Sequence, residues 1–280
     1  MTLKKLSPIL PDRPPLNRLN GRVALVTGIA RPRGVGNAIA QLFAKEGAAV
    51  VLTDIAKELW DRTKELQNAG YKAVGYQIDL IKLDDVKGMV KKVLDQFGKI
   101  DILCNVAGKS VPPRPPFLEM SVEYWDMVMD RNLRTTFNCC KAALPDMAEK
   151  KYGKVVNIGS TTGTMTVYRY CAAYAASKGA VSALTKALAL EFGEYNINVN
   201  AILPGDIDTG DQPWTPQEGP RDLGRFSPRL KPPISRPAMP EEIADLALYL
   251  STDESRFITG ADILCDGGAL IVEPFPGGPQ

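Results

Sequence analysis

The stretch RVALVTGIARPRGVGNAIAQLFAKEGAAVVLTD, residues 22–54, decides the fold of this chain. It opens with a short apolar run, passes through a glycine-rich turn, continues with Ala38, Leu42 and Phe43 at helical spacing, and closes on a second apolar run. Short apolar runs of this kind are typical of strands that are buried on both faces. A strand, a helix and a strand in this order predict two parallel strands joined by a right-handed crossover.

The same alternation continues along the chain and predicts seven buried strands, at residues 22–27, 49–54, 72–77, 100–105, 154–159, 197–203 and 261–266. We therefore expect a doubly wound α/β fold, with a parallel sheet of about seven strands and helices on both faces. One domain is expected over residues 19–268, between an N-terminal extension, residues 1–18, and a C-terminal tail, residues 269–280. Within it, residues 206–237 are predicted to form a long loop that acts as a substrate lid.

The composition argues against several classes of protein. Lys and Arg number 34 against 32 Asp and Glu, so the net charge of +2 gives no reason to expect nucleic acid or an anionic membrane as a partner. No apolar run reaches the roughly 20 residues of a membrane span, and we expect a cytoplasmic protein. The five cysteines lack metal-ligand spacing and histidine is absent, so we expect no metal site and no histidine-based catalysis.

The glycine-rich turn is a candidate cofactor site. Gly28, Gly34 and Gly36 lie where the first strand gives way to a helix, so they permit a tight turn and a close backbone approach. The N–H groups at the start of that helix can bind a pyrophosphate. A strand, a glycine loop and a helix together predict a dinucleotide site.

Charged residues near this turn bear on which dinucleotide binds. Asp54 ends the second strand about 20 residues beyond the glycines, where a carboxylate can bind the adenosine ribose hydroxyls and repel a 2′-phosphate. Arg31 and Arg33 point the other way, because a guanidinium can pair with the phosphate of NADP. The pattern favours NAD, although Asp54 can also be a solvated loop acid. Asp79, after the third strand, either lies at the adenine edge or caps the next helix.

Without histidine, Tyr174 and Lys178 are the candidates for proton transfer. Residues four apart lie on one face of a helix, so the phenol and the ammonium can address one small volume. A free tyrosine has a pKa near about 10, but a nearby ammonium favours the phenolate. A surface tyrosine beside a solvated lysine is the alternative interpretation of the pair.

The chain resembles the short-chain dehydrogenase/reductase family through four motifs that occur in the family's order. The segment that begins at Thr27 resembles the family's TGxxxGxG with two extra residues, NVAG (105–108) resembles NNAG, YAASK (174–178) is similar to Tyr-x-x-x-Lys, and PGDIDT (204–209) resembles PGxIxT. The resemblance covers residues 19–268 and implies a Rossmann-like fold.

The resemblance also implies an activity: an NAD(P)-dependent oxidoreductase that interconverts a secondary alcohol and a ketone by hydride transfer, assembled as a homotetramer. Its catalytic group would be Asn132, Ser160, Tyr174 and Lys178, with Thr161 a weaker candidate because Ser160 lies one residue further from Tyr174 than is common. Tyr174 would exchange the proton, Ser160 would bind the substrate oxygen, Lys178 would hold the nicotinamide ribose and Asn132 would fix a water. Cofactor contacts are implied for Gly28, Arg33, Gly34, Val35, Gly36, Asp54, Asp79, Leu80, Asn105, Ala107, Gly108, Tyr174, Lys178, Pro204, Gly205, Ile207 and Thr209.

Other functions remain as alternatives. A 3-oxoacyl-thioester reductase of the same family would use the same catalytic residues. Enoyl reductases have a loop similar to GIA at 28–30, but they space tyrosine and lysine by seven, and the residue seven before Lys178 is Cys171. A non-catalytic dinucleotide-binding regulator would not need the tyrosine, lysine and serine that this chain has.

The substrate is the least defined part of the prediction. The predicted lid has more basic than acidic residues, which fits either an anionic substrate or a solvated face; they are Arg221, Arg225, Arg229, Lys231 and Arg236 against Asp211, Glu218 and Asp222. An apolar or aromatic wall is expected from Trp214, Phe226, Tyr168, Tyr170 and the loop 109–117. We expect a small-molecule alcohol or ketone.

Overall fold

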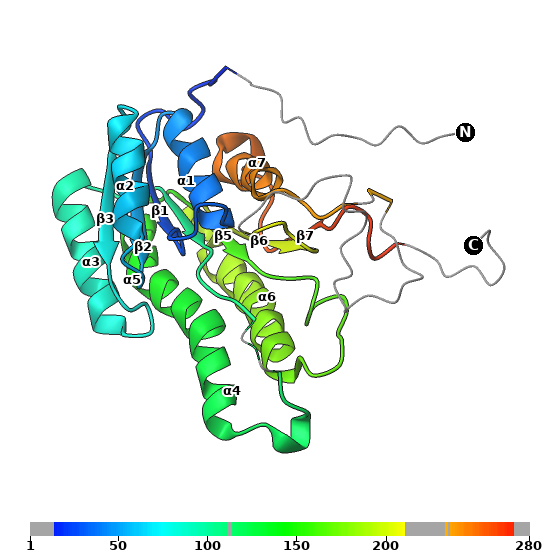
Figure 1. Cartoon of the computed structure of the whole chain (residues 1–280). Coiled ribbons are helices and arrows are strands. Elements are labelled where there is room, and N and C mark those ends of the chain that lie inside the picture. Colours follow the sequence, from blue (N-terminus) through cyan, green and yellow to red (C-terminus); the bar gives the residue numbers. More distant parts are fainter. Residues whose placement is uncertain (1–13, 111, 113, 211–232, 235, 272–280) are drawn as a thin grey trace, which may run out of the picture.

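The computed structural model describes residues 14–110, 112, 114–210, 233–234 and 236–271 of the chain. Its strands form one parallel sheet and are β1 (Val23–Thr27), β2 (Ala49–Asp54), β3 (Ala73–Gln77), β4 (Ile102–Asn105), β5 (Gly153–Ile158), β6 (Ile197–Pro204) and β7 (Asp262–Cys265). The order across the sheet is β3-β2-β1-β4-β5-β6-β7 (Figure 1). The predicted doubly wound parallel fold is therefore confirmed, and the predicted strand limits lie within two residues of those observed.

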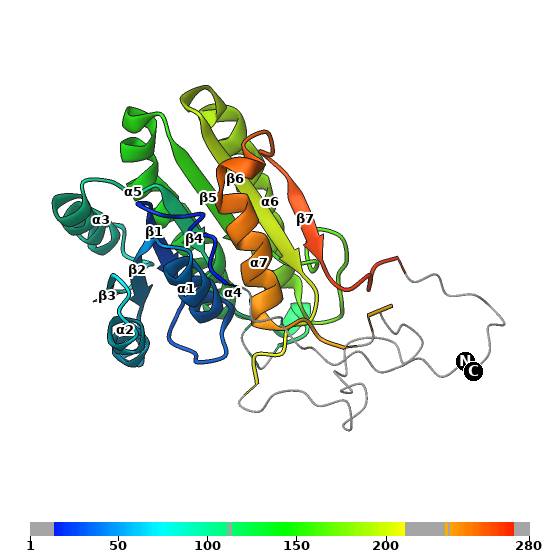
Figure 2. The ribbon, with the colours of Figure 1, turned by 90° about the horizontal axis from the view of Figure 1, so that it is seen from above.

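Helices cover both faces of this sheet. They are α1 (Val35–Lys45), α2 (Leu59–Asn68), α3 (Leu83–Phe97), α4 (Val122–Met129), α5 (Thr135–Lys150), α6 (Ala172–Phe192) and α7 (Pro240–Ser251). Short 3₁₀ turns lie at Phe117–Glu119, Gly193–Tyr195 and Asp253–Ser255. Helices α1, α2 and α7 pack on one face, and α3, α5 and α6 pack on the other (Figure 2).

The hydrophobic core consists of two clusters, one on each face of the sheet. In β1, Ala24 and Val26 face the cluster under α1 and α7, while Val23 and Leu25 face the cluster under α3 and α5. Because successive side chains of a strand point to opposite faces, a strand between two helical layers must be apolar at every position. This is why β1 reads as a continuous apolar run.

The prediction that all seven strands are buried is wrong for the two edge strands. The side chains of β3 and β7 are half-buried or exposed, with Leu264 of β7 42% exposed. Each of these strands has a neighbour on one side alone, at opposite ends of the sheet order. Sequence shows that a strand is apolar, but its place in the sheet depends on long-range pairing.

Carboxylates hold two segments that flank the sheet, the residues before β1 and the start of α7. Arg18, at the end of the predicted N-terminal extension, donates to the carboxylate of Glu46 from both its backbone N and its guanidinium. Helix α7 begins at Pro240, and the side chain of Glu242 accepts the backbone N–H of Met239 at the start of this helix. Within the described ranges, no helix is long and apolar enough to cross a membrane. Residues 1–13, 272–280 and most of the predicted lid lie outside them.

Candidate active site

The candidate site lies at the carboxyl edge of the sheet, where the loops after β1, β4, β5 and β6 meet. The chain runs outward from β1 to β3 and then returns to place β4 on the other side of β1. Ligands of open α/β sheets bind in the crevice at such a reversal of strand order. The fold thus brings the predicted site segments to one edge, although they are far apart in sequence.

The glycine turn after β1 is packed so closely that side chains do not fit. Gly28 has a φ of +72°, and a Cβ there would lie 2.8 Å from the Cα of Ala107. A Cβ on Gly36 would lie 2.4 Å from the carbonyl oxygen of Gly28. Helix α1 begins at Val35, after Gly34, and carries no acidic residue in its first turn. Its N–H groups are thus available to an anion, which fits the pyrophosphate of a dinucleotide.

Replacing Gly36 by alanine is expected to disrupt this turn. The new Cβ meets backbone that cannot move aside cheaply, so we expect a loss of about 1–3 kcal/mol in the free energy of unfolding and weaker NADH binding. Gly88→Ala is the matched control, because a Cβ at Gly88 in α3 meets nothing within 4 Å and alanine favours helix by up to about 1 kcal/mol. Denaturant unfolding and NADH titration measure both effects, and equal behaviour of the two variants would contradict this account.

Asp54 is held in place by backbone amides at the end of β2. Its Oδ2 accepts the N–H of Ala30 at 2.9 Å, and its Oδ1 accepts the N–H of Ala56 at 3.0 Å. The interpretation as a solvated loop acid is therefore wrong, since the carboxylate joins β2 to the glycine turn. Each oxygen keeps a second lone pair that can accept a ribose hydroxyl.

Arg33 is paired across the site rather than left for a ribose phosphate. Its guanidinium forms an ion pair with Asp208 (2.9 Å) and donates to the carbonyl oxygen of Gly210 (3.1 Å). Asp208 is 2% exposed, and Arg33 lines a cavity of about 120 Å³ together with Thr209 and Gly210. The charge of Arg33 is thus already compensated, which weakens the argument for NADP that rested on it.

Two predicted cofactor residues after β3 have side chains with structural partners. Asp79 does not cap α3, whose N-cap is Lys82; its Oδ1 accepts the N–H of Ile81 instead. Leu80 packs into the core beneath α3 and α5, and its carbonyl oxygen accepts from the side chain of Asn138. Any contact that Leu80 makes with a cofactor must come from its backbone.

The loop after β4 is tied to β1 by a buried hydroxyl. Thr27 Oγ1 accepts the N–H groups of both Val106 and Ala107 at 2.9 Å. The side chain of Asn105 is buried; its amide nitrogen donates to Asn157 Oδ1 in β5 at 2.8 Å, and its Oδ1 has no donor among the described residues. Ala107 and Gly108 are left facing the glycine turn and Asn132.

The loop after β6 runs back beside the segment that precedes α7. Ile207 pairs with Ala238 in an isolated bridge, and Asp208 donates its N–H to the carbonyl oxygen of Ala238 at 2.8 Å. Pro204 and Gly205 precede this bridge, with Gly205 packed against Asp266. These contacts hold the predicted loop residues opposite the glycine turn, where Thr209 and Arg33 share one cavity.

Tyr174 and Lys178 lie in the first turns of α6, as predicted. Lys178 is 4% exposed, and its ammonium donates to the carbonyl oxygen of Ile158 at 2.7 Å. The ammonium lies 6.0 Å from the centre of the Tyr174 ring. Burial lowers the pKa of Lys178 to about 8, because the low-dielectric interior disfavours its charge. The interpretation of this pair as a solvated lysine beside a surface tyrosine is therefore wrong.

Ser160 follows β5 and is half-buried, whereas the alternative residue Thr161 is 6% exposed. The Ser160 hydroxyl accepts the N–H of Thr162 at 3.1 Å, which leaves its own proton free to be donated. The backbone N–H of Thr161 bonds to Pro204 and ties this loop to β6. Exposure therefore favours Ser160 over Thr161 as the residue that meets a ligand.

Asn132 lies in a π-helical turn, Asp130–Arg134, that joins α4 to α5. Its amide nitrogen donates to the carbonyl oxygens of Val128 (2.9 Å) and Lys109 (3.2 Å). Its Oδ1 is buried and has no hydrogen-bond donor among the residues that the structure describes, and a Cβ on Gly108 would lie 2.6 Å from it. A buried acceptor without a donor suits a site that takes a water or ligand, and π-turns are frequent at functional sites. Asn132 thus lies at the junction of α4 and α5.

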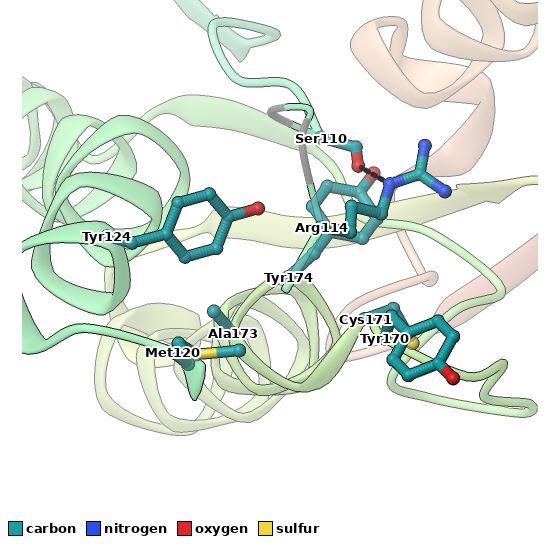
Figure 3. A pocket seen from close by; sticks show the side chains of 8 residues that line it. All are labelled: Ser110, Arg114, Met120, Tyr124, Tyr170, Cys171, Ala173 and Tyr174. Atoms are coloured by element: carbon teal, nitrogen blue, oxygen red, sulfur yellow. Dashed lines mark hydrogen bonds between the residues drawn. The ribbon is translucent and has the colours of Figure 1, made fainter. Parts of the chain in front are cut away.

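A small pocket opens beside Tyr174 (Figure 3). Its walls come from the loop after β4, from α4 and from the start of α6, and consist of Ser110, Arg114, Met120, Tyr124, Tyr170, Cys171, Ala173 and Tyr174. The sequence predicted Tyr170 and the loop 109–117 for a substrate wall, but it gave no signal for Met120 or Tyr124. The other predicted wall residues, Trp214 and Phe226, and the lid charges apart from Arg236 lie outside the described residues. Arg236 itself is paired with Glu242.

Comparisons with known proteins match nearly the whole chain. A family model described as Enoyl-(Acyl carrier protein) reductase matches residues 28–269. The chain is 37% identical over 257 residues to the 3-oxoacyl-[acyl-carrier-protein] reductase FabG of Thermotoga maritima, covering 91% of this chain and 100% of that protein. It is 35% identical over 255 residues to an NAD-dependent glycerol dehydrogenase of Listeria innocua, covering 90% and 95%. A solved structure from Agrobacterium tumefaciens, described as a candidate gluconate dehydrogenase, has a TM-score of 0.82 at 31% identity and covers 92% of this chain and 100% of that one.

Proposed function

The chain belongs to the short-chain dehydrogenase/reductase family and is an oxidoreductase, and on this premise we propose that it interconverts a secondary alcohol and a ketone with Tyr174 as the proton-transferring group. The observation that carries the proposal is the buried ammonium of Lys178 beside the ring of Tyr174, which itself lines the pocket. When bound, a nicotinamide dinucleotide supplies the hydride chemistry. The close-packed glycine turn and the start of α1 fit the pyrophosphate of such a group.

Lys178 is suited to support an ionised phenol. It is buried and forms no ion pair with any carboxylate of the described chain, so no other anion competes for its charge. A cation near a phenol favours the phenolate. We infer that Tyr174 takes the proton of the substrate hydroxyl during oxidation and returns a proton to the carbonyl oxygen during reduction, while Ser160 donates a hydrogen bond to the same oxygen.

Asn132 is proposed to hold a water that carries protons between Lys178 and solvent. Two properties of its side chain support this role: the amide nitrogen is fixed by two backbone carbonyls, and the carbonyl oxygen is buried without a donor. A buried acceptor without a donor has lost its hydrogen bonds to solvent, and binding a water restores one of them.

We further propose that NAD is the cofactor, and Asp54 supplies the test. The fixed carboxylate would accept the ribose hydroxyls and repel a 2′-phosphate, so NADH is expected to bind at least about tenfold more tightly than NADPH. Asp54→Ala should remove most of that difference by weakening NADH binding and relieving the repulsion of NADPH. Fluorescence titration of the wild type and of Asp54→Ala with NADH and NADPH measures the ratio of the two affinities. If Asp54→Ala left the ratio unchanged, Asp54 would have no role in the choice of nucleotide.

A second candidate activity is the reduction of a 3-oxoacyl thioester, and the likeness to the FabG of Thermotoga maritima favours it. It would use the same Tyr174 chemistry, so a direct comparison of acetoacetyl-CoA with simple ketones separates the two. An enoyl reductase is disfavoured, since Cys171 occupies the position seven residues before Lys178. A non-catalytic regulator would bind NADH but turn over no substrate.

A homotetramer and a cytoplasmic location complete the proposal. Apolar side chains are exposed on α4, α5 and α6, namely Val122 (69%), Phe137 (45%) and Leu190 (87%), and such residues suit packing between subunits. The five cysteines are unpaired, which fits a reducing compartment. Light scattering of the purified protein is expected to give the mass of four chains, and a monomer would contradict the assembly.

A further inference from the structure

Arg114 is a cation in the wall of the pocket beside Tyr174 that the proposed proton transfer does not use. Its Nε donates to the hydroxyl of Ser110 at 2.9 Å, and its guanidinium lies 5.4 Å from the centre of the Tyr168 ring. Figure 3 shows Ser110, Arg114 and Tyr174 together on one side of the pocket, with the hydroxyl of Tyr124 directed toward them. Arg114 is half-buried and forms no ion pair with any residue of the described chain.

We propose that Arg114 binds the carboxylate of the substrate and that the natural substrate is a hydroxy acid or the corresponding keto acid. This inference rests on the proposed function of Tyr174, because it names the substrate of the same site. A guanidinium presents a fork of N–H donors that matches a carboxylate in a bidentate pair. Ser110 uses the Nε, so the two terminal nitrogens of Arg114 remain for an anion.

The contacts of Arg114 hold it in a single orientation rather than neutralise it. The hydroxyl of Ser110 fixes the Nε, and the ring of Tyr168 attracts the cation without removing its charge. A side chain fixed in advance loses less conformational entropy on binding a ligand. Neighbouring Ser110 and Tyr168 are thus positioning residues for the guanidinium.

The charge of the pocket favours a carboxylate over a more highly charged ligand. Among the described residues that line it, Arg114 is the sole cation. One guanidinium balances the single charge of a carboxylate, whereas a phosphate monoester carries about two charges and is usually bound by several donors.

The test compares a keto acid with its neutral ester. Levulinate and its two next longer homologues, each with its methyl ester, are supplied with NADH, and oxidation of NADH is followed by absorbance. The acids are expected to have the higher kcat/KM. In Arg114→Gln the kcat/KM for the acids should fall between about 10- and 100-fold, because a charge-assisted pair is lost, while the values for the esters stay within about twofold.

Two further variants separate recognition of the carboxylate from general effects. Arg169 is exposed in the loop that carries Tyr168 and does not line the pocket. Arg169→Gln therefore removes a positive charge nearby and should leave kcat/KM unchanged for both the acids and the esters. Arg114→Lys keeps the charge without the fork and should restore part of the activity on the acids. Melting temperature and NADH affinity are measured for all variants to establish that they fold.

Each contrary outcome identifies what has failed. The inference is overturned if the esters react as well as the acids, or if Arg114→Gln lowers kcat/KM equally for acids and esters. It is overturned as well if phosphorylated ketones react better than the acids. It is also overturned if the wild type binds NADH but reduces neither acid nor ester. A wild type that does not bind NADH overturns the proposed function itself.

Discussion

Replacement of Tyr174 by phenylalanine is expected to lower kcat by about 10²- to 10⁴-fold while NADH still binds, since general acid–base catalysis contributes that much. The variant removes one hydroxyl and keeps the ring that lines the pocket. The chain has no histidine, and among the described residues that line the pocket Tyr174 is the one whose ring lies beside the buried ammonium of Lys178. Steady-state turnover and NADH fluorescence titration measure the two quantities separately.

Tyr170→Phe is the matched control for this experiment. Tyr170 lines the same pocket but is 54% exposed and lies outside α6. Its loss of a hydroxyl should change kcat by no more than a few fold. Turnover near the wild-type value in Tyr174→Phe would show that another group transfers the proton.

Replacement of Lys178 by methionine is expected to abolish turnover and yet to leave the folded protein as stable as the wild type or slightly more stable. Methionine fills similar space without a charge, so the phenolate loses its counter-charge and the nicotinamide ribose loses a donor. The stability gain follows from the pKa of Lys178, which burial lowers from 10.5 to about 8. Holding a proton on this buried amine costs up to about 3 kcal/mol at neutral pH, at about 1.4 kcal/mol for each pKa unit.

Two effects compete in this variant, and their magnitudes decide the sign. The variant also loses the hydrogen bond from the Lys178 ammonium to the carbonyl of Ile158, and a hydrogen bond with a charged donor contributes about 1.5–3 kcal/mol. The relief of the buried charge, up to about 3 kcal/mol, equals or slightly exceeds this loss, so the melting temperature at pH 7 should stay unchanged or rise slightly. A fall of several kcal/mol in the free energy of unfolding would instead make Lys178 a structural residue.

The pH dependence gives an independent check on the same residue. Between pH 8 and pH 10.5 the unfolded chain binds more protons at Lys178 than the folded chain does, since the folded pKa is the lower one. This group therefore makes the wild type more stable as pH rises through that window. Lys178→Met lacks the effect, so the stability advantage of the variant should shrink as pH rises from 8 toward 10.5. A constant difference would mean that Lys178 is not buried as an ammonium.

Local sequence patterns predicted the parts of the protein that depend on local structure. The apolar runs located β1, β2, β4, β5 and β6 because these strands lie between two helical layers, and they also located the edge strands β3 and β7. The glycine turn and the Tyr174–Lys178 pair were predictable because a tight turn and a four-residue spacing fix geometry within a few residues.

Features that depend on contacts between distant segments were not predictable. Arg33 pairs with Asp208 from the loop after β6, which no local pattern indicates. The π-turn at Asn132 replaces a continuous helix, and its buried oxygen becomes evident only when Gly108 is packed against it. The position of Arg114 in a pocket without a paired carboxylate likewise depends on three separate segments, the loop after β4, α4 and the start of α6.

The most direct test of the central claim is a fluorescence titration of the purified protein with NADH and NADPH, followed by absorbance measurements at the nicotinamide band with secondary alcohols and ketones. We predict that NADH binds more tightly than NADPH and that at least one alcohol or ketone changes the nicotinamide absorbance at a rate that depends on Tyr174. Failure of both nucleotides to bind would contradict the assignment of an NAD-dependent Tyr174–Lys178 oxidoreductase.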